Sequence, residues 1–471
     1  MLFNSLIFLV FGALFFAIWP WVKKFQKSKL IVLIIASFIF YGWWDWRFLF
    51  LIIFSGCIDF WAGLRMHRNP NSRKTWLIFS LIGNIGSLAI FKYSGFIAQN
   101  IDIVLEWLNF SMRLSDNIPN FALILPVGIS FYTFQSMSYT IDVYKGKLEP
   151  TKNIYLFFAY LSMFPQLVAG PIIRARDLIP QLQQYRIVNE TQRWHGFKLI
   201  VIGFFKKVVL ADNLGEMVNW AFYSETPFQS TSYWWIIAIA FTFQIYYDFS
   251  GYTDIARGLA KWMGFHFKMN FNHPYIAISL RDFWQRWHIS LSTWFRDYVY
   301  IPLGGSKKGE FAAHIFMWIT MLVSGLWHGA AWTFIIWGAI HAFFTSIERL
   351  TKWPKYLHKS IPGIIFSWFF VFMQVVIAYV FFRASSFHQA WEIVKTMFSF
   401  NHVHYHFADI NNLIFFGLAI FFEAILVLNR YFVQVRYNKK RIVFEVIIYA
   451  FLITMIIFFR GPEAAFIYFQ F

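Results

Sequence analysis

The chain has few of the residues that support metal, redox or soluble-enzyme chemistry. Its 471 residues include a single cysteine, Cys57, which excludes an intrachain disulfide, a CxxC redox pair and a cysteine-rich metal site. The sequence contains no GxSxG, HExxH or GxGxxG motif, and LGGSKKG lacks the GxxxxGK[ST] spacing of a P-loop. Soluble-type hydrolases, metalloproteases and dinucleotide enzymes therefore lose their usual sequence support, and we expect no bound metal or cofactor.

Charge is scarce as well, and apolar residues take its place. Only 14% of the residues are charged, while 59% are hydrophobic and 23% aromatic. About a dozen mostly apolar runs approach the roughly 20 residues that cross a bilayer as a helix. The sequence therefore predicts an all-α polytopic membrane protein embedded in membrane lipids. The first run lacks a basic n-region and a cleavage site, so we expect it to remain a transmembrane helix.

The basic residues indicate membrane orientation rather than nucleic-acid binding. The formal net charge is +18, but lysine and arginine fall mainly in short gaps between apolar runs. Basic gaps at 23–29, 65–74 and 145–152 are expected in the cytoplasm, and the acidic gaps 97–120 and 212–232 outside. Counting the runs between these gaps predicts that both termini are extracytoplasmic. We expect no nucleic-acid partner.

We interpret residues 1–471 as one membrane-embedded domain, because no repeat, low-complexity linker or long soluble stretch interrupts the apolar runs. The most polar long section, 248–310, is expected to be cytoplasmic-side and re-entrant. Within it, aromatic and basic spacing predicts an amphipathic helix over 279–300. The run 154–172 has basic gaps on both sides, so we expect it to enter and leave the membrane on the cytoplasmic side.

His328 is the most unusual ionisable residue of the chain. It lies in SGLWHGAAW, and no Asp, Glu, Lys or Arg occurs between Glu310 and Glu348. An ionisable side chain inside a membrane segment is a functional-site hypothesis by default. The flanking Gly325 and Gly329 also fit simple close packing of helices. If His328 is functional, we expect its ring to line a closed internal cavity that is reached from both membrane faces, rather than to face lipid.

The other histidines leave two interpretations open. His288 lies in an aromatic-rich stretch, where an interfacial packing role is about as reasonable as a role in a cavity shared with His328. His314 and His341 are interpreted as interface or packing histidines. The alternating histidines of HVHYH, at 402–406, have no evident carboxylate or cysteine partner, so a metal site is not favoured there.

Two aspartates in YYDFSGYTDIARG follow an apolar run. Asp248 and Asp254 are expected chiefly to pair with Arg257 or other cations and so to fix the fold. A contribution of Asp248 to substrate binding is kept as a second interpretation.

Several blocks of the sequence resemble a known family. RDFWQRWHISLSTWFRDYVYIPLGG and SGLWHGAAWTFIIWGAIHA are similar to the membrane-bound O-acyltransferase family, in its bacterial branch of alginate-type O-acetylation proteins. FYGWWDWRFLFLI, LPVGISFYTFQSMSYTIDVYKG, FPQLVAGPIIRARDLIPQL and YDFSGYTDIARGLAKWMG follow the same branch in the same order. The resemblance covers roughly residues 1–350, and the remaining spans less distinctly.

The resemblance implies a ring of transmembrane helices around a thin, funnelled catalytic core. His328 corresponds to the catalytic histidine of GLWHG, and His288 to the second active-site candidate, in RWHISLS. The implied donor is acetyl-CoA or another cytoplasmic acyl thioester. Further contacts with donor or substrate are expected from a polar and aromatic set: Arg281, Arg286, Trp287, Ser290, Trp327 and Asp248.

The implied activity is O-acetylation of a cell-envelope or secreted polysaccharide across the bacterial inner membrane. Bacterial members usually act with a separate extracytoplasmic SGNH-type or related acetyltransferase, so either a partner protein or the glycan is the expected immediate acceptor. A D-alanyl-transfer type that uses a carrier-protein thioester is the nearest alternative. A non-enzymatic transporter or glycan-export scaffold, with buried His, Asp and Arg holding its helices, is the alternative from another class.

Overall fold

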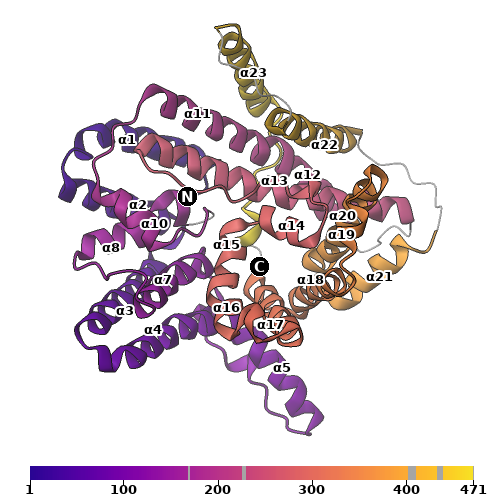
Figure 1. Cartoon of the computed structure of the whole chain (residues 1–471), viewed down its shortest axis with the longest axis horizontal. Helices are drawn as coiled ribbons and strands as arrows, with labels where there is room; N and C mark the ends of the chain where they lie inside the picture. The colour runs from indigo at the N-terminus through magenta and orange to yellow at the C-terminus, as the bar shows by residue number, and fades with distance from the viewer. Residues whose placement is uncertain (168–169, 225–229, 401–409, 432–438, 470–471) are drawn as a thin grey trace. The chain divides into compact units, whose positions relative to one another are not determined.

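The structure is a computed structural model, and it describes the chain except for residues 168–169, 225–229, 401–409, 432–438 and 470–471 (Figure 1). The described residues form helices and irregular segments and contain no β-strand. The all-α expectation is therefore confirmed. The chain divides into two compact units, one of residues 1–196 and 256–268, the other of residues 197–255 and 269–470.

Five stretches of the described chain are long and apolar enough to cross a membrane: Gln26–Arg68, Pro70–Trp107, Glu310–His328, Ile361–Arg383 and Leu413–Arg430. Gln26–Arg68 contains two helices of 20 residues each, joined by a short 3-10 turn. Such a helix rises about 30 Å, the thickness of the hydrocarbon core. Other expected runs form helices that are shorter or carry buried polar residues, as α13 does (Thr231–Met263).

The first unit contains the helices α1 (Leu6–Val22), α2 (Gln26–Asp45), α3 (Leu49–Arg68), α4 (Arg73–Leu88), α5 (Ser94–Trp107), α6 (Asn120–Leu123), α7 (Ile129–Tyr144), α8 (Ile154–Leu161), α9 (Phe164–Leu167) and α10 (Ala175–Gln183). Helices α3, α4 and α7 lie side by side (Figure 1). A buried carboxylate joins them: Asp59 of α3 accepts hydrogen bonds from Ser80 (2.5 Å) and Asn84 (2.9 Å) of α4 and from Ser136 of α7. Because unpaired polar groups are costly in a membrane, this network fixes the mutual register of the three helices.

Helix α8 bears on the expected re-entrant run 154–172. It has eight residues, which rise only about 12 Å, and Ser162 ends it before the short α9 begins at Phe164. Neither helix is long enough to cross the membrane.

The second unit contains α12 (Asp212–Tyr223), α14 (Leu280–Arg286), α15 (Ile289–Phe295), α16 (Ile301–Leu303), α17 (Glu310–His328), α18 (Trp332–Thr351), α19 (Trp353–Leu357), α20 (Ile361–Arg383), α21 (Phe387–Met397), α22 (Ile410–Tyr431) and α23 (Lys439–Phe458). Two further helices contribute residues to both units: α11 (Glu190–Phe204) and α13.

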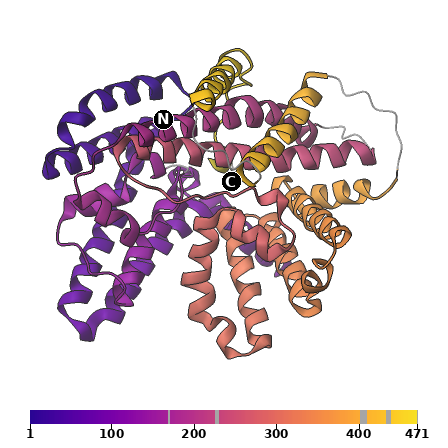
Figure 2. The same cartoon turned by 45° about the horizontal axis from the view of Figure 1, so that its top comes forward.

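Helices α17 and α18 form a tight antiparallel hairpin (Figure 2). A Cβ atom on Gly325 would collide with the Phe334 carbonyl of α18, and one on Gly338 would collide with the Met321 carbonyl of α17. The glycines therefore allow close backbone approach, which is the packing interpretation of Gly325. They bring the turn after His328 against the start of α18.

The expectation of one continuous amphipathic helix over 279–300 is wrong. The backbone breaks at Trp287 and His288, so α14 ends at Arg286 and α15 begins at Ile289. His288 adopts the left-handed conformation, with φ 40° and ψ 55°, in which a helix cannot continue. After α15 the chain forms a wider π-helical turn over Arg296–Tyr300. His288 lies in this break and is fully buried.

Candidate active site

His328 is the last residue of α17, and the extended backbone of Gly329 ends the helix after it. Only 2% of its surface is exposed. Four aromatic rings surround the imidazole, with centroid distances of 4.9 Å to Trp337, 5.0 Å to Trp327, 5.3 Å to Phe382 and 5.6 Å to Tyr468. The imidazole is therefore enclosed by protein side chains, and its expected place beside a cavity that is reached from both membrane faces stays a prediction.

His288 is fully buried in the break between α14 and α15. Its Nδ1 atom accepts the backbone N–H of Leu291 at 3.4 Å, which caps the start of α15. The ring also packs edge-on against Phe249, at a centroid distance of 4.5 Å. Burial lowers the pKa of His288 to about 3, so the imidazole is neutral. Because Nδ1 accepts, the proton of the neutral ring lies on Nε2, which is then a donor.

The indole of Trp327 contacts both histidines. Its ring centroid lies 6.4 Å from that of His288 and 5.0 Å from that of His328. Trp327 itself is 3% exposed. The structure thus brings the histidines of the two quoted blocks, 40 positions apart in the sequence, into one buried aromatic cluster, which the sequence alone did not require.

A polar clamp from the segment before α14 holds the backbone around His288. The Asn270 carbonyl accepts the N–H of Ile289 at 2.8 Å. The Asn270 side-chain oxygen accepts both the N–H (3.0 Å) and the hydroxyl (2.8 Å) of Ser290. Asn270 is 1% exposed, so these bonds are shielded from water. Ser290, which we expected to contact substrate, donates both of these hydrogen bonds to Asn270 in the structure.

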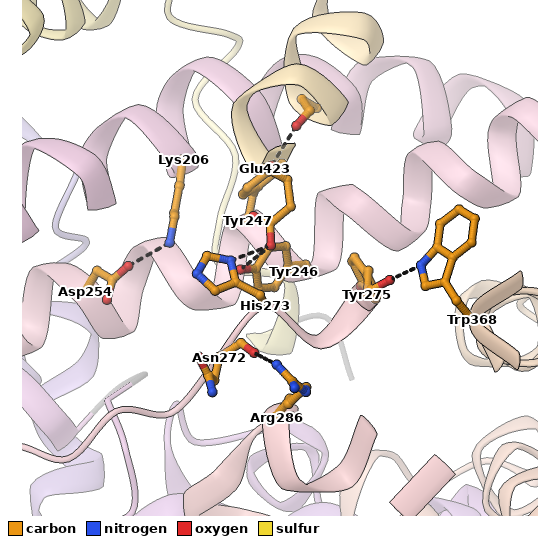
Figure 3. A network of polar contacts seen from close by, with 11 residues as sticks. Lys206, Tyr246, Tyr247, Asp254, Asn272, His273, Tyr275, Arg286, Trp368 and Glu423 are labelled. Atoms are coloured by element: carbon orange, nitrogen blue, oxygen red, sulfur yellow. Dashed lines mark hydrogen bonds and ion pairs between the residues drawn. The ribbon is translucent and has the colours of Figure 1, made fainter. Parts of the chain in front are cut away.

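The segment after Asn270 is fastened in turn to α14 and α22 (Figure 3). Arg286 donates to the Asn272 carbonyl at 3.3 Å, and His273 bonds Glu423 of α22 at 2.8 Å through Nδ1. Trp368 of α20 donates to the Tyr275 carbonyl at 2.7 Å. Hydrogen bonds from α14, α20 and α22 thus hold the segment that contacts the backbone around His288.

The remaining expected donor-binding residues have anchoring roles in the structure. Arg281 is exposed, and its backbone N–H donates to the buried Glu348 carboxylate at 3.3 Å. Arg286 bonds Asp282 one turn earlier, at 2.7 Å. Trp287 is 2% exposed and stacks on Phe283 with the rings 11° apart in plane. Their contacts with a donor stay a prediction.

Asp248 and Asp254 of α13 both pair with lysines, which are among the cations that the structural interpretation expected. Asp248 bonds Lys207 at 2.7 Å. Asp254 bonds Lys206 at 2.8 Å, as Figure 3 shows. Both lysines lie in the π-helical segment Phe205–Ala211. Asp248 has a second partner, the backbone N–H of Ile467 at 2.7 Å.

Tyr468 is the residue that the sequence analysis missed. It lies near the end of the chain, yet its ring packs against Phe249 at 4.7 Å as well as against His328. Burial raises the pKa of its phenol above the usual range, so the hydroxyl keeps its proton. The closely spaced aromatic residues of FIYFQF, at 466–471, are the sequence signal that could have indicated Tyr468. The sequence blocks that resemble the family end near residue 350 and do not include it.

Within the described residues, no group of three or more His, Cys, Asp or Glu side chains is placed to hold a metal ion. The histidines at 402–406 lie outside the described residues. His341 is buried against Trp337 and Trp284, at centroid distances of 4.8 and 5.0 Å, which fits its interpretation as a packing residue.

The described residues form an all-helical, apolar protein with two histidines in one buried cluster, and comparison with known proteins gives the class of integral membrane protein and the family. Residues 151–387 match the family model of the membrane-bound O-acyltransferases. The chain is 40% identical to the probable alginate O-acetylase AlgI of Pseudomonas aeruginosa over 383 residues, covering 80% of this chain and 71% of the relative. The chain belongs to the membrane-bound O-acyltransferase family and is a multi-pass membrane acyltransferase, which confirms the resemblance.

Two other relatives have different acceptors in their names. The peptidoglycan O-acetyltransferase of Helicobacter pylori is 33% identical over 413 residues, covering 81% of this chain and 76% of the relative. The teichoic acid D-alanyltransferase of Bacillus subtilis is 29% identical over 275 residues, covering 54% of this chain and 68% of the relative. Similarity to the D-alanyl-transfer branch is thus lower and covers less of the chain.

Proposed function

We propose that this protein takes an acetyl group from a cytoplasmic thioester, acetyl-CoA, and passes it across the bacterial inner membrane for O-acetylation of a cell-envelope or secreted polysaccharide. The observation that carries the proposal is the packing of the Tyr468 ring against the buried imidazole of His328, at a centroid distance of 5.6 Å. Acyl transfer to oxygen requires a base and a hydroxyl within reach of each other, and these are the two side chains that the packing brings together. The relatives named for O-acetylation of alginate and peptidoglycan support the acceptor class.

His328 acts as the general base and the Tyr468 hydroxyl as the first acyl acceptor. The imidazole takes the phenol proton while the phenol oxygen attacks the thioester carbonyl. The carbon–sulfur bond then breaks, and the proton passes from the imidazolium to the leaving thiolate. The products are an acetyl ester on Tyr468 and the free thiol of CoA. The raised pKa of Tyr468 is the reason that a base is needed, because the phenol does not ionise by itself.

His288 stabilises the oxygen of the reacting carbonyl. It is neutral, and its Nδ1 is occupied by the Leu291 N–H, so Nε2–H is the atom that it offers to a developing oxyanion. A buried, pre-oriented donor of this kind strengthens as negative charge grows on oxygen. Removing such a donor typically costs about a hundredfold or more in rate.

The two faces of the membrane supply the two substrates. In the orientation predicted by the basic gaps, the C-terminus is extracytoplasmic, so Tyr468 reaches His328 from the outer side and the thioester from the cytoplasm. An aryl ester on Tyr468 is a good donor for the next step, because phenol, with a pKa of about 10, leaves more readily than an alcohol. An extracytoplasmic SGNH-type or related acetyltransferase is the proposed recipient, and it delivers acetyl to the glycan.

The decisive experiment measures envelope-glycan O-acetyl and CoA release from acetyl-CoA in His328→Ala at matched membrane abundance. His314, half-buried on the same helix, supplies the matched control His314→Ala. We expect O-acetylation to disappear in the first variant and to persist in the second. Unchanged acetylation in His328→Ala would remove His328 from the mechanism. If the purified wild type, with its partner supplied, released no CoA, a transporter or export scaffold would replace the enzyme.

Tyr468→Phe tests the acceptor separately, because it keeps the ring and its packing and removes only the hydroxyl. We expect loss of glycan acetylation in the variant, and in the wild type an acetyl mass on the C-terminal peptide after incubation with acetyl-CoA. Full activity of Tyr468→Phe would show that acetyl bypasses this residue. If the same peptide instead acquired D-alanine from a carrier-protein thioester and no acetyl from acetyl-CoA, the D-alanyl-transfer alternative would hold.

A further inference from the structure

The C-terminal segment, defined here as residues 461–468, is fastened at its start where the π-helical segment Phe205–Ala211 runs into α12. Gly461 donates its N–H to the Val208 carbonyl at 2.8 Å. A Cβ atom at Gly461 would lie 2.6 Å from the Asn213 nitrogen and 2.8 Å from the Asp212 carbonyl carbon. Both are backbone atoms that cannot rotate away. Only glycine therefore lets the segment approach α12 this closely.

The end of the segment is fastened to a buried ion cluster. One oxygen of Asp248 accepts the Ile467 N–H at 2.7 Å, and the other bonds the Lys207 ammonium at 2.7 Å. The same ammonium bonds Asp212 at 2.7 Å. The three charged side chains are at most 4% exposed. A hydrogen bond to a buried ionised carboxylate is stronger than one between neutral groups, so Asp248 is a firm anchor for the Ile467 backbone.

The middle of the segment is not packed down in the same way. A cavity of about 240 Å³ is lined by Lys207, Asp248, Gln244 and segment residues from Pro462 to Ile467. Pro462, Glu463 and Ala465 are exposed. Continuous packing resumes at Phe466, whose ring lies 4.7 Å from Tyr252. The segment is thus held at its two ends, and its middle lines the cavity between them.

We propose that Asp248, charged through its pairing with Lys207, is a latch that positions the C-terminal segment so that Tyr468 meets His328. The proposal rests on the proposed role of Tyr468. Its basis is the Asp248 bond to Ile467, the residue directly before Tyr468, since adjacent Cα atoms are only about 3.8 Å apart. An ion cluster that served only to join helices would not need a carboxylate oxygen directed at the backbone of this segment. Asp248 is in this sense a positioning residue.

The position of the segment can be measured without any enzymatic step. In a Cys57→Ser background, Ile467→Cys places a thiol at a position that is 3% exposed and keeps the backbone N–H. We expect a thiol reagent to label this cysteine at least about tenfold faster when Asp248→Asn is added. The weakened anchor lets the C-terminal segment detach more often, and each detachment exposes the thiol to the reagent. Asp254→Asn is the matched control, since it makes the same substitution at an ion-pair partner of Lys206 on the same helix. It should leave labelling unchanged.

Activity then separates positioning from folding. In the Cys57→Ser background with Ile467 intact, Asp248→Asn should lower kcat for acetyl transfer to Tyr468 at least about tenfold with an unchanged KM for acetyl-CoA. Asp248→Glu should restore part of the rate. Unchanged labelling in Asp248→Asn would overturn the latch whatever the activity. Faster labelling with undiminished acetylation of Tyr468 would overturn the positioning role.

Gly461→Ala provides a second route that leaves Asp248 and its bond to Ile467 unchanged and acts at the other anchor, beside Asp212. The added Cβ displaces the segment at its other anchor, so we expect faster labelling of Ile467→Cys and the same fall in kcat. If neither Gly461→Ala nor Asp248→Asn moved the labelling rate, the segment would not be held as proposed. Failure of the proposed function has a different signature, because Tyr468→Phe would then stay fully active while both labelling effects persisted.

Discussion

The two histidines of the site lie in different kinds of backbone. His288 lies in a break between two short helices, where Asn270 clamps the residues after it and Leu291 donates to its Nδ1. His328 ends a helix of a tight hairpin, and four aromatic rings pack around it. The hydrogen bond that Nδ1 of His288 accepts fixes its tautomer, with the proton on Nε2. This environment suits a donor of constant orientation, whereas the role proposed for His328 is that of a base that gains and loses a proton.

The largest expected effect distinguishes the two roles directly. His328→Gln should abolish acetyl transfer, a loss of at least about a thousandfold, because glutamine cannot accept the Tyr468 proton as a base. His288→Gln should lose less, about ten- to a hundredfold, because the amide N–H can still donate to a carbonyl oxygen. Single-turnover transfer from acetyl-CoA to Tyr468 measures both. Equal losses in the two variants would contradict the division of roles.

The second prediction tests how packing holds His328. Gly325→Leu forces α17 away from the Phe334 carbonyl of α18, at a cost of about 1–3 kcal/mol in overpacking. We expect a strong loss of acetyl transfer and a lower Tm in detergent. Gly12→Leu is the control, since a Cβ there has no neighbour within 4 Å. A variant at Gly325 with wild-type Tm and activity would show that the close approach of the hairpin does not matter.

The third prediction tests the polar clamp. Asn270→Ala removes the oxygen that accepts two hydrogen bonds from Ser290 and leaves the backbone bond to Ile289 in place. Losing two such bonds in a buried site destabilises the break by about 1–3 kcal/mol. Acetyl transfer should fall about tenfold through misplacement of His288. In the His288→Gln background the same change should cost less, and a fully additive loss in this double-mutant cycle would indicate that Asn270 acts elsewhere.

The difference between the two histidine environments also explains what the sequence could predict. The helical fold and the anomaly at His328 follow from the apolar runs, because local composition determines them. The break at His288 does not, since its left-handed backbone depends on Asn270, 18 positions earlier, and the local pattern favours one helix over 279–300. Tyr468 and the pairing of Asp248 with Lys207 join residues far apart in the chain, and no spacing rule indicates them.

The smallest effect concerns pH. Burial lowers the folded-state pKa of His288 to about 3, while an unfolded histidine has a pKa of about 6.5. Between these values the unfolded state binds one more proton, so His288 reduces the stability of the folded protein progressively as the pH falls below 6.5, by about 1.4 kcal/mol per unit. Above 6.5 the residue is neutral in both states and has no such effect. His288→Gln should therefore show a smaller fall in Tm between pH 6.5 and 4.5 than the wild type, with little difference in this respect above pH 7. Parallel Tm curves for the two proteins would mean that burial does not lower the pKa of His288 in the folded state, and would contradict the lowered pKa from which its neutral state is assigned here.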